Sequence, residues 1–493
     1  MKNNMKEAKQ HSVKYNFLMN FLLSASQFIF PLITFPYISR VLLAEGSGKI
    51  TFASSVANYF LMVASLGIPT YGIRACAQVR DDRKKLSRTA HELLFINSVT
   101  TLVVAITYVI CVLEVPRFRK DEVLFLINGV NIVLNMVGMN WLFQALEQYD
   151  YITIRSLIFK VISIVLMVIL VHQKSDYIIY GAITVFAAVG SNLLNCIRAR
   201  HYIDAKWLGD YHIRRHIKPI LILFAQSLAI SIYTNLDTVM LGFMKTDVDV
   251  GYYNAAVKVK TILVSLVTSL GNVLLPRMAY YAKENRNKEF MNTMTKALSF
   301  TMLISLPLAC YFCLYSPESI QFLAGNGYNG AILAMRIITL SIVPIGLTGI
   351  LGIQVLTAIE KEKYVLYSVI VGALVDFFLN LLLIPNMGAA GASFATLIAE
   401  VVVLIVQIFY TKSLLMKIFD KLYGHIYLFI ALFASGICSL VKLTKIQSNF
   451  IILVISSIIF WVIYCVGLIW KKDELMVNFC KEILSKRRKY KVK

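Results

Sequence analysis

Fourteen long apolar stretches constrain the fold of this chain more than any other feature. A helix needs about 20 mostly apolar residues to cross the hydrocarbon core of a bilayer. Such stretches, bounded by charged residues, Gly or Pro, predict spanning helices over residues 17–37, 50–68, 93–113, 123–143, 152–171, 177–197, 220–243, 252–275, 297–315, 331–358, 364–384, 389–410, 422–441 and 450–470. A membrane β-barrel would show short alternating segments instead. We therefore expect an all-α integral membrane protein.

The charge of the chain is distributed unevenly between the predicted loops. The net charge is +22, which alone could suggest nucleic-acid binding. However, 36 of the 49 Lys and Arg lie in the two terminal segments and the even-numbered loops, and only nine lie in the opposite loops. Cytoplasmic loops of membrane proteins retain Lys and Arg. We expect both termini to be cytoplasmic, and the basic residues 486–493 to contact anionic membrane lipids rather than nucleic acid.

The first twelve predicted helices contain a local repeat. Gly48 and Gly251 each open a helix, and Arg74 and Arg277 each follow 26 residues later, end a helix and begin a basic loop. The two sets are 203 residues apart. Because six helices make each unit, the repeats are expected to be parallel. The predicted organisation is a bundle over residues 1–218, a bundle over residues 219–411, and two further helices with a basic tail over residues 412–493.

Four basic residues within or at the ends of predicted spans indicate a substrate pathway. An ionised side chain at mid-bilayer costs at least about 2.5 kcal/mol, so it normally faces a bundle interior or a watery cavity. Arg40, Lys258 and Arg336 fall in the outer half of the predicted membrane, and Lys160 falls nearer the cytoplasm. Arg and Lys suit phosphate or acidic sugars. The alternative is a structural Asp237–Lys258 pair with side chains that extend to the interface.

Carboxylates and helix breakers suggest coupling and movement. Asp376 and Glu400 fall near mid-depth, where a desolvated carboxyl has a raised proton affinity and could couple transport to ions. A buried, hydrogen-bonded carboxyl would explain the same pattern. Pro36 and Pro344 would permit helix bending during alternating access, although Pro is also ordinary in membrane helices.

Several motifs in order resemble a known family. They are residues 35–42 (FPYISRVL) with Gly48, residues 67–74, Trp141 to Glu147, Arg155 with Lys160, Asp237 to Gly242, Gly251 to Tyr253, Leu275 to Arg277, Asn380 to Pro385, and Gly388 with Gly391 to Glu400. Together they resemble the Wzx-type polysaccharide flippases of the multidrug/oligosaccharidyl-lipid/polysaccharide exporter superfamily. The resemblance covers helices 1 to 12. One departure is Asp376, where the family pattern has Asn.

The resemblance implies a function. The substrate would be an undecaprenyl-pyrophosphate-linked repeat unit of capsule or another surface polysaccharide, carried to the outer leaflet of a bacterial cytoplasmic membrane. Asp237, Asp376, Asn380 and Glu400 would form a polar or ion-coupling site. A proton or sodium gradient would drive transport without a bound cofactor, and glycan polymerase and other assembly proteins would be partners.

Three alternatives remain open at this point. A multidrug exporter of the same superfamily would share the fold, but carboxylates should dominate its cavity. A peptidoglycan-precursor flippase would use the same physics. A membrane glycan polymerase or ligase would usually carry a large external loop, which the short predicted loops do not provide. The sequence contains no HExxH, Walker or GxSxG motif, so we expect no enzyme activity.

Overall fold

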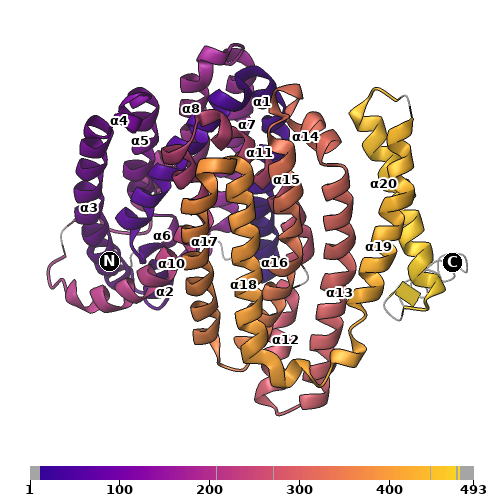
Figure 1. Cartoon of the computed structure of the whole chain (residues 1–493). Coiled ribbons are helices and arrows are strands. Elements are labelled where there is room, and N and C mark those ends of the chain that lie inside the picture. Colours follow the sequence, from indigo (N-terminus) through magenta and orange to yellow (C-terminus); the bar gives the residue numbers. More distant parts are fainter. Residues whose placement is uncertain (1–11, 207, 270, 445, 474–475, 478–493) are drawn as a thin grey trace, which may run out of the picture. The chain divides into compact units, whose positions relative to one another are not determined.

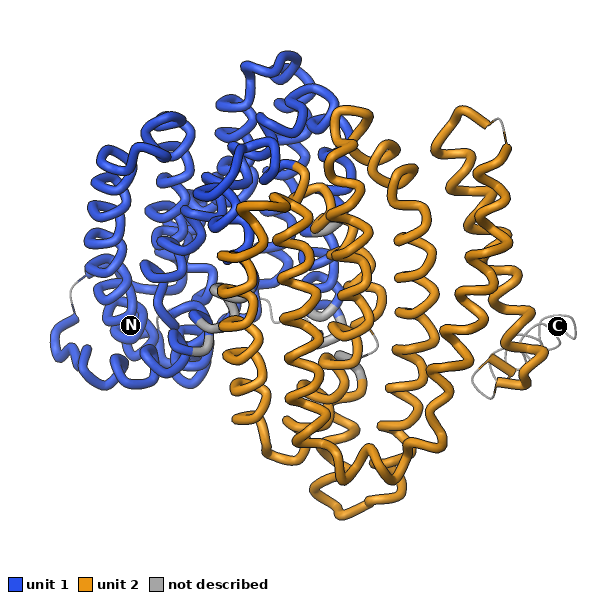
Figure 2. The backbone as a smooth tube through the Cα atoms, viewed as in Figure 1, with its two compact units in different colours: residues 1–251 blue, residues 252–493 orange. Residues whose placement is uncertain are grey.

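The computed structural model describes residues 12–473, apart from residues 207, 270 and 445, together with residues 476 and 477. Helices dominate, and no strand occurs within these ranges. The chain forms two compact units, residues 1–251 and residues 252–493 (Figure 2).

Unit 1 contains ten α-helices and two short helical segments before it enters α11 (Figure 1). They are α1 (Val13–Ser65), α2 (Ile68–Ala77), α3 (Arg83–Glu114), α4 (Pro116–Arg119), α5 (Glu122–Gly138), α6 (Asn140–Ala145), α7 (Tyr149–Leu170), η1 (Lys174–Asp176), α8 (Tyr177–Val185), η2 (Phe186–Gly190), α9 (Asn192–Ala199) and α10 (Arg214–Met244).

Unit 2 begins within α11 (Asp247–Thr268). Its later elements are α12 (Gly271–Lys283), α13 (Asn287–Leu314), α14 (Ser316–Ala324), η3 (Asn326–Tyr328), α15 (Ala331–Leu340), α16 (Ile342–Thr348), η4 (Gly349–Leu356), α17 (Glu362–Met387), α18 (Ala389–Leu415), η5 (Phe419–Lys421), α19 (Gly424–Ser439), η6 (Leu440–Leu443) and α20 (Asn449–Trp470).

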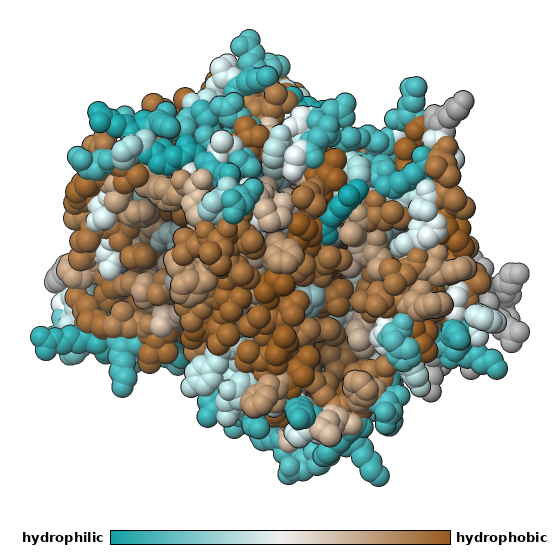
Figure 3. All heavy atoms as spheres, in the orientation of Figure 1, coloured by the Kyte–Doolittle hydropathy of each residue, from teal (hydrophilic) through white to brown (hydrophobic). Residues whose placement is uncertain are grey.

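The prediction of an all-α membrane protein is confirmed. Among the described residues, eleven helical stretches are long and apolar enough to cross a membrane. The first of them, Leu18–Ala77, covers the first two predicted spans, and α10 and α11 lie over the seventh and eighth. On the face drawn in Figure 3, hydrophobic side chains gather along the middle of the helices and hydrophilic ones at their ends. Every other predicted span coincides with one of the remaining stretches.

Local chemistry sets two helix boundaries in unit 1. Leu43 has a φ of 55° and divides α1 at a kink, which separates the first two predicted spans. Pro31 and Pro36 lie inside the helix before this kink. Asp82 precedes α3, and its carboxylate accepts hydrogen bonds from the backbone N–H groups of Lys84 and Lys85. These bonds, first that from Lys85, hold the pKa of Asp82 below its usual range, as expected for a helix N-cap.

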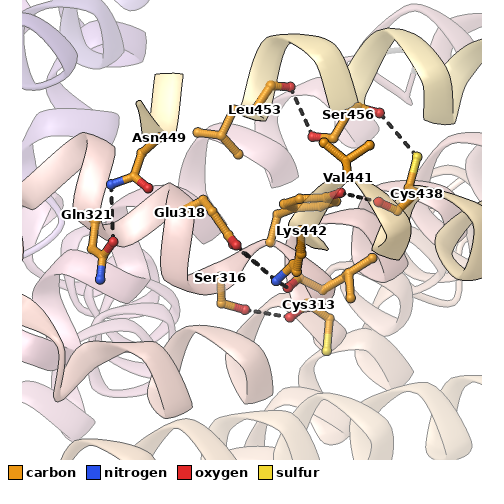
Figure 4. Close-up of polar contacts among 12 residues, drawn as sticks. Cys313, Ser316, Glu318, Gln321, Cys438, Val441, Lys442, Asn449, Leu453 and Ser456 are labelled. Atoms are coloured by element: carbon orange, nitrogen blue, oxygen red, sulfur yellow. Dashed lines mark hydrogen bonds and ion pairs between the residues drawn. The ribbon is translucent and has the colours of Figure 1, made fainter. Parts of the chain in front are cut away.

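The last two helices are fastened to α13 and α14 by polar contacts (Figure 4). The Lys442 ammonium forms an ion pair with Glu318 at 3.1 Å and donates to the Leu314 carbonyl at 2.7 Å. Asn449 donates to Gln321 at 3.1 Å. The Tyr315 hydroxyl donates to the Cys438 carbonyl at 2.6 Å. Since polar contacts of this kind favour one helix register within the membrane, α19 and α20 form an ordered part of unit 2.

Two details of the predicted repeat and hinges can be compared with the structure. Arg74 lies in the last turn of α2, but Arg277 lies inside α12, six residues before its end. The expectation that each Arg ends a helix is therefore wrong for Arg277. Pro344 lies in α16, a seven-residue helix between a break at Ser341 and the π-helix η4. A proline removes one backbone hydrogen bond, which agrees with the interrupted helix there.

Candidate functional site

The two repeat-related glycines make close backbone contacts within unit 1. A Cβ added to Gly48 would lie 1.7 Å from the carbonyl oxygen of Asp247, and one added to Gly251 would lie 2.0 Å from that of Ala44. Ala44 and Asp247 are 203 residues apart, as are Gly48 and Gly251. The contact is therefore reciprocal, as at an interface related by a two-fold axis. Only a residue without a side chain allows this approach.

Polar and aromatic contacts surround the glycine pair. Arg117 donates from Nε to the Gly242 carbonyl at 2.7 Å and forms an ion pair with Asp247. Lys49 and the Tyr177 hydroxyl both bind Asp121, at 3.1 and 2.9 Å. The Arg117 contacts join α4 to α10 and to the start of α11, and Asp121, which precedes α5, joins α1 to α8. Lys49 and Arg117 are thus each paired with a carboxylate.

Arg40 lies in α1 just before the kink, and its side chain is exposed. Its guanidinium donates to the carbonyl of Pro36, one turn earlier. The carbonyl that Pro36 leaves without its backbone donor is that of Leu32, one turn earlier, so Arg40 adds a side-chain donor to a different carbonyl of the same helix. Arg40 and Pro36, predicted for separate roles, therefore act on the same turn of α1.

Lys160 lies in a cavity within unit 1. The cavity has a volume of about 440 Å³ and is bounded by α1, α7, α8 and η2. The Lys160 ammonium donates to Ser26 Oγ at 2.7 Å and lies 5.4 Å from the centre of the Phe30 ring. Half of the sixteen lining residues are polar, namely Ser26, Gln27, Thr34, Ser156, Lys160, Ser163, Tyr180 and Thr184. The Ser26 contribution has no signal in the sequence, because Ser is common in membrane helices.

A polar seam runs between α17 and α18 in unit 2. The buried residues of α17 recur every four positions, at Ser368, Gly372, Asp376, Asn380 and Ile384, and so form one face. Glu400 and Gln407 are buried on α18. Gln407 donates to Ser368 at 3.1 Å, and the hydroxyls of Tyr253 and Thr396 lie 3.1 Å apart. The predicted polar residues Asp376, Asn380 and Glu400 thus share a buried helix pair with polar groups that the prediction omitted.

The other predicted pathway residues are divided between the units. Asp237 is buried on α10 in unit 1, whereas Lys258 is half-buried on α11 and Arg336 is exposed on α15, both in unit 2. The grouping of Arg40, Asp237, Lys258 and Arg336 around one chamber therefore stays a prediction. The same holds for the predicted bundle boundaries at 218/219 and 411/412.

A polar cluster around the buried Glu92 was missed by the prediction. Glu92 of α3 accepts hydrogen bonds from the His212 backbone, from Arg215 at 2.6 Å and from His216 at 2.7 Å. The other ring nitrogen of His216 lies 2.8 Å from the Tyr71 hydroxyl. Burial lowers the pKa of His216, against the opposing effect of Glu92. The cluster attaches the beginning of α10 to α2 and α3, and only tertiary contact brings these residues together.

Family profiles match most of the length of this chain. The profile described as polysaccharide biosynthesis protein matches residues 13–282, which is more than half of the chain. The chain belongs to the polysaccharide biosynthesis protein family. A second profile, MatE, matches residues 223–382 of this family member. Both matches agree with the resemblance seen in the sequence motifs.

Related proteins support this assignment. A candidate O-antigen transporter of Escherichia coli (strain K12) is 25% identical over 404 residues, which are 82% of this family member and 97% of the relative. Among solved structures, the lipid II flippase MurJ in an inward closed conformation has a TM-score of 0.73 at 15% identity and covers 93% of this chain and 100% of its own. An inward-facing multidrug resistance MATE transporter has a TM-score of 0.61 at 14% identity, over 82% of this chain and 99% of its own. These structures show that the chain has the fold of this transporter superfamily.

Proposed function

We propose that this protein is a flippase that moves lipid-linked oligosaccharide from the inner to the outer leaflet of a bacterial cytoplasmic membrane. The observation that carries the proposal is the relative from Escherichia coli, which aligns over nearly its whole length. The substrate would be a repeat unit of capsule or another surface polysaccharide on an undecaprenyl pyrophosphate carrier. Glycan polymerase and other assembly proteins would be partners, and the protein itself would carry out no covalent chemistry.

Basic side chains would receive the anionic head group. Arg40, Lys258 and Arg336 are the proposed pyrophosphate ligands because Arg offers paired donors and Lys a compact charge. Both termini would be cytoplasmic, with the basic residues 486–493, which lie outside the described residues, against anionic lipids. In that orientation the Gly48–Gly251 contact would face outside. Its backbone-to-backbone packing supports a role as the closed outer end during alternating access.

An ion gradient would drive the cycle. Asp376 and Glu400 are buried, with exposed fractions of 2% and 8%. Each lies twelve residues from Gly388, which joins α17 to α18. Buried carboxyls of this kind can bind a proton or sodium, since desolvation favours the neutral or ion-bound form. Asp237 and Asn380 would complete the polar site, and Pro36 and Pro344 would absorb helix bending.

The proposal is tested by measuring the leaflet position of lipid-linked oligosaccharide. In a deletion strain, lipid-linked repeats should accumulate on the cytoplasmic leaflet, and purified protein in liposomes should restore their movement. Arg336→Ala should lower the rate about tenfold, because a charge-assisted hydrogen bond to phosphate is lost. Insertion and melting temperature should stay unchanged. Arg119→Ala, which also removes an exposed Arg, is the matched control and should transport normally.

A multidrug exporter is the second candidate because the MatE profile matches residues 223–382. Liposomes loaded with organic cations separate the two functions. Two results together would favour multidrug export over the proposed function. They are a normal leaflet distribution of oligosaccharide in the deletion strain and export of organic cations by the purified protein.

A further inference from the structure

We propose that the Lys160 cavity is a second binding site, which holds the phosphate group of a membrane amphiphile within unit 1. The phosphate would lie at the Lys160 ammonium and the adjoining hydrocarbon against the apolar wall. The proposal extends the proposed function and rests on it only for the identity of a polyprenyl carrier. Binding at this site can be measured without transport.

Among the described side chains, the charge of Lys160 has no carboxylate counter-ion. Lys160 is the twelfth of 22 residues in α7 and is half-buried. None of the sixteen described lining residues is Asp or Glu, and among the described residues no carboxylate lies within ion-pair distance of its ammonium. A lone cation at this depth is unfavourable in hydrocarbon. An anionic ligand would compensate it.

The neighbouring hydroxyls position the ammonium but do not supply the charge. Ser26 accepts from Lys160 and itself donates to the Leu23 carbonyl at 2.6 Å. Ser163 and Thr184 donate to carbonyls of their own helices at 2.8 and 2.7 Å. Two of the three N–H groups of the ammonium remain available after the bond to Ser26. Recognition of an anion would therefore depend mainly on Lys160.

The size and composition of the cavity indicate what accompanies the phosphate. A volume of about 440 Å³ is in the range of small-molecule sites and exceeds the space that one phosphate needs. The other half of the lining is apolar and includes Leu23, Ile164, Met167 and Ile183. This wall suits a hydrocarbon segment. The ligand class is therefore an amphiphile and not free inorganic phosphate.

The number of cations distinguishes this site from the proposed pyrophosphate site. Lys160 is the single basic residue among the described lining residues. One cation matches one phosphate group, whereas a pyrophosphate would bring a second charged group without a basic partner. We therefore expect a monophosphate to bind at least as tightly as the corresponding diphosphate.

The π-helix η2 contributes one part of the cavity wall. Ala187 and Ala188 of η2 line it, and Phe186 packs on Phe159 with ring centres 4.9 Å apart. A π-helical turn is rare and often marks a functional site, because it widens the helix locally. Here it places two small side chains at the cavity and turns the large Phe186 onto α7.

The test measures binding of farnesyl phosphate to the purified full-length protein in detergent, with farnesol as the neutral control. Farnesyl phosphate should bind at least tenfold more tightly than farnesol. Lys160→Met should remove this advantage, Lys160→Arg should retain most of it, and Lys260→Met, a lysine in α11 outside the cavity, should not change it. Melting temperatures of all variants show whether each is folded.

Further arms identify the source of the phosphate. Stronger competition by farnesyl phosphate than by dioctanoyl phosphatidylglycerol would identify a prenyl carrier, and the reverse would identify a membrane phospholipid; both support the site. Equal binding of farnesol and farnesyl phosphate, or unchanged binding in folded Lys160→Met, overturns it. The purified protein could fail to move oligosaccharide in the leaflet assay while its binding of farnesyl phosphate still depends on Lys160. That result would contradict the proposed function and support the cavity site.

Discussion

Two helix pairs that the predicted repeat makes counterparts are built in opposite ways. In unit 1, α7 and α8 with η2 hold a cation, Lys160, beside a cavity of about 440 Å³. In unit 2, α17 and α18 bury the carboxyls of Asp376 and Glu400 between closely packed helices. The start of α18 is a run of small residues, Ala389 to Ser393, and small residues let helices approach closely.

This difference shows that the packing of a helix pair limits the size of its ligand, while the charged residue sets the charge of that ligand. An open pair with one cation can admit a phosphate amphiphile, whereas a tight pair with carboxyls can admit only a small cation or a proton. The same supersecondary unit, used twice, would thus serve an organic ligand in one unit and a coupling ion in the other. The packing around the charged residue and the sign of its charge would together decide whether a unit binds the organic ligand or the ion.

The largest expected effect tests the packing difference. A Cβ at Gly391 would lie 2.6 Å from the Leu383 carbonyl oxygen, so Gly391→Leu should destabilise the protein by about 3 kcal/mol and lower its melting temperature in detergent. Ala187→Leu, directed into the open cavity, should leave the melting temperature nearly unchanged. Equal losses in the two variants would show that the helix pairs are packed alike.

An intermediate effect is expected from the carboxyls. Asp376→Asn should lower gradient-driven oligosaccharide movement about tenfold, because an ion loses its charged ligand, and should leave Lys160-dependent farnesyl phosphate binding unchanged. The assay uses liposomes with an imposed proton or sodium gradient. Asp420→Asn, at an exposed position in η5, serves as the control. If the Asp376→Asn variant responds fully to both gradients, Asp376 does not take part in ion coupling.

The smallest expected effect concerns the hydroxyl beside the cation. Ser26→Ala removes the acceptor that holds Lys160 at 2.7 Å, so farnesyl phosphate affinity should fall about threefold, the usual range for one neutral partner. Titration of the purified variant measures the change. Tighter binding would instead mean that Ser26 competes with the ligand for the ammonium.

Some features of the site were accessible from the sequence and others were not. Lys160, Asp376 and Glu400 stand out because ionisable residues are rare in apolar stretches. Ser26 and Gln407 do not, because their importance depends on the neighbour they contact, 134 residues away for Ser26 and 39 for Gln407. The Glu92 cluster was missed for the same reason, since its partners follow more than 100 residues later.

The sequence by itself determined that the chain is helical and spans a membrane, because hydrocarbon excludes unpaired backbone groups and so ties apolar length to helix. It also revealed the glycines and charges that repeat. Tertiary structure decided that Gly48 and Gly251 meet backbones reciprocally, that Lys160 faces a cavity and that Asp376 lies in a tight seam. Those outcomes depend on packing between distant helices, and no local pattern encodes the distance between two helices.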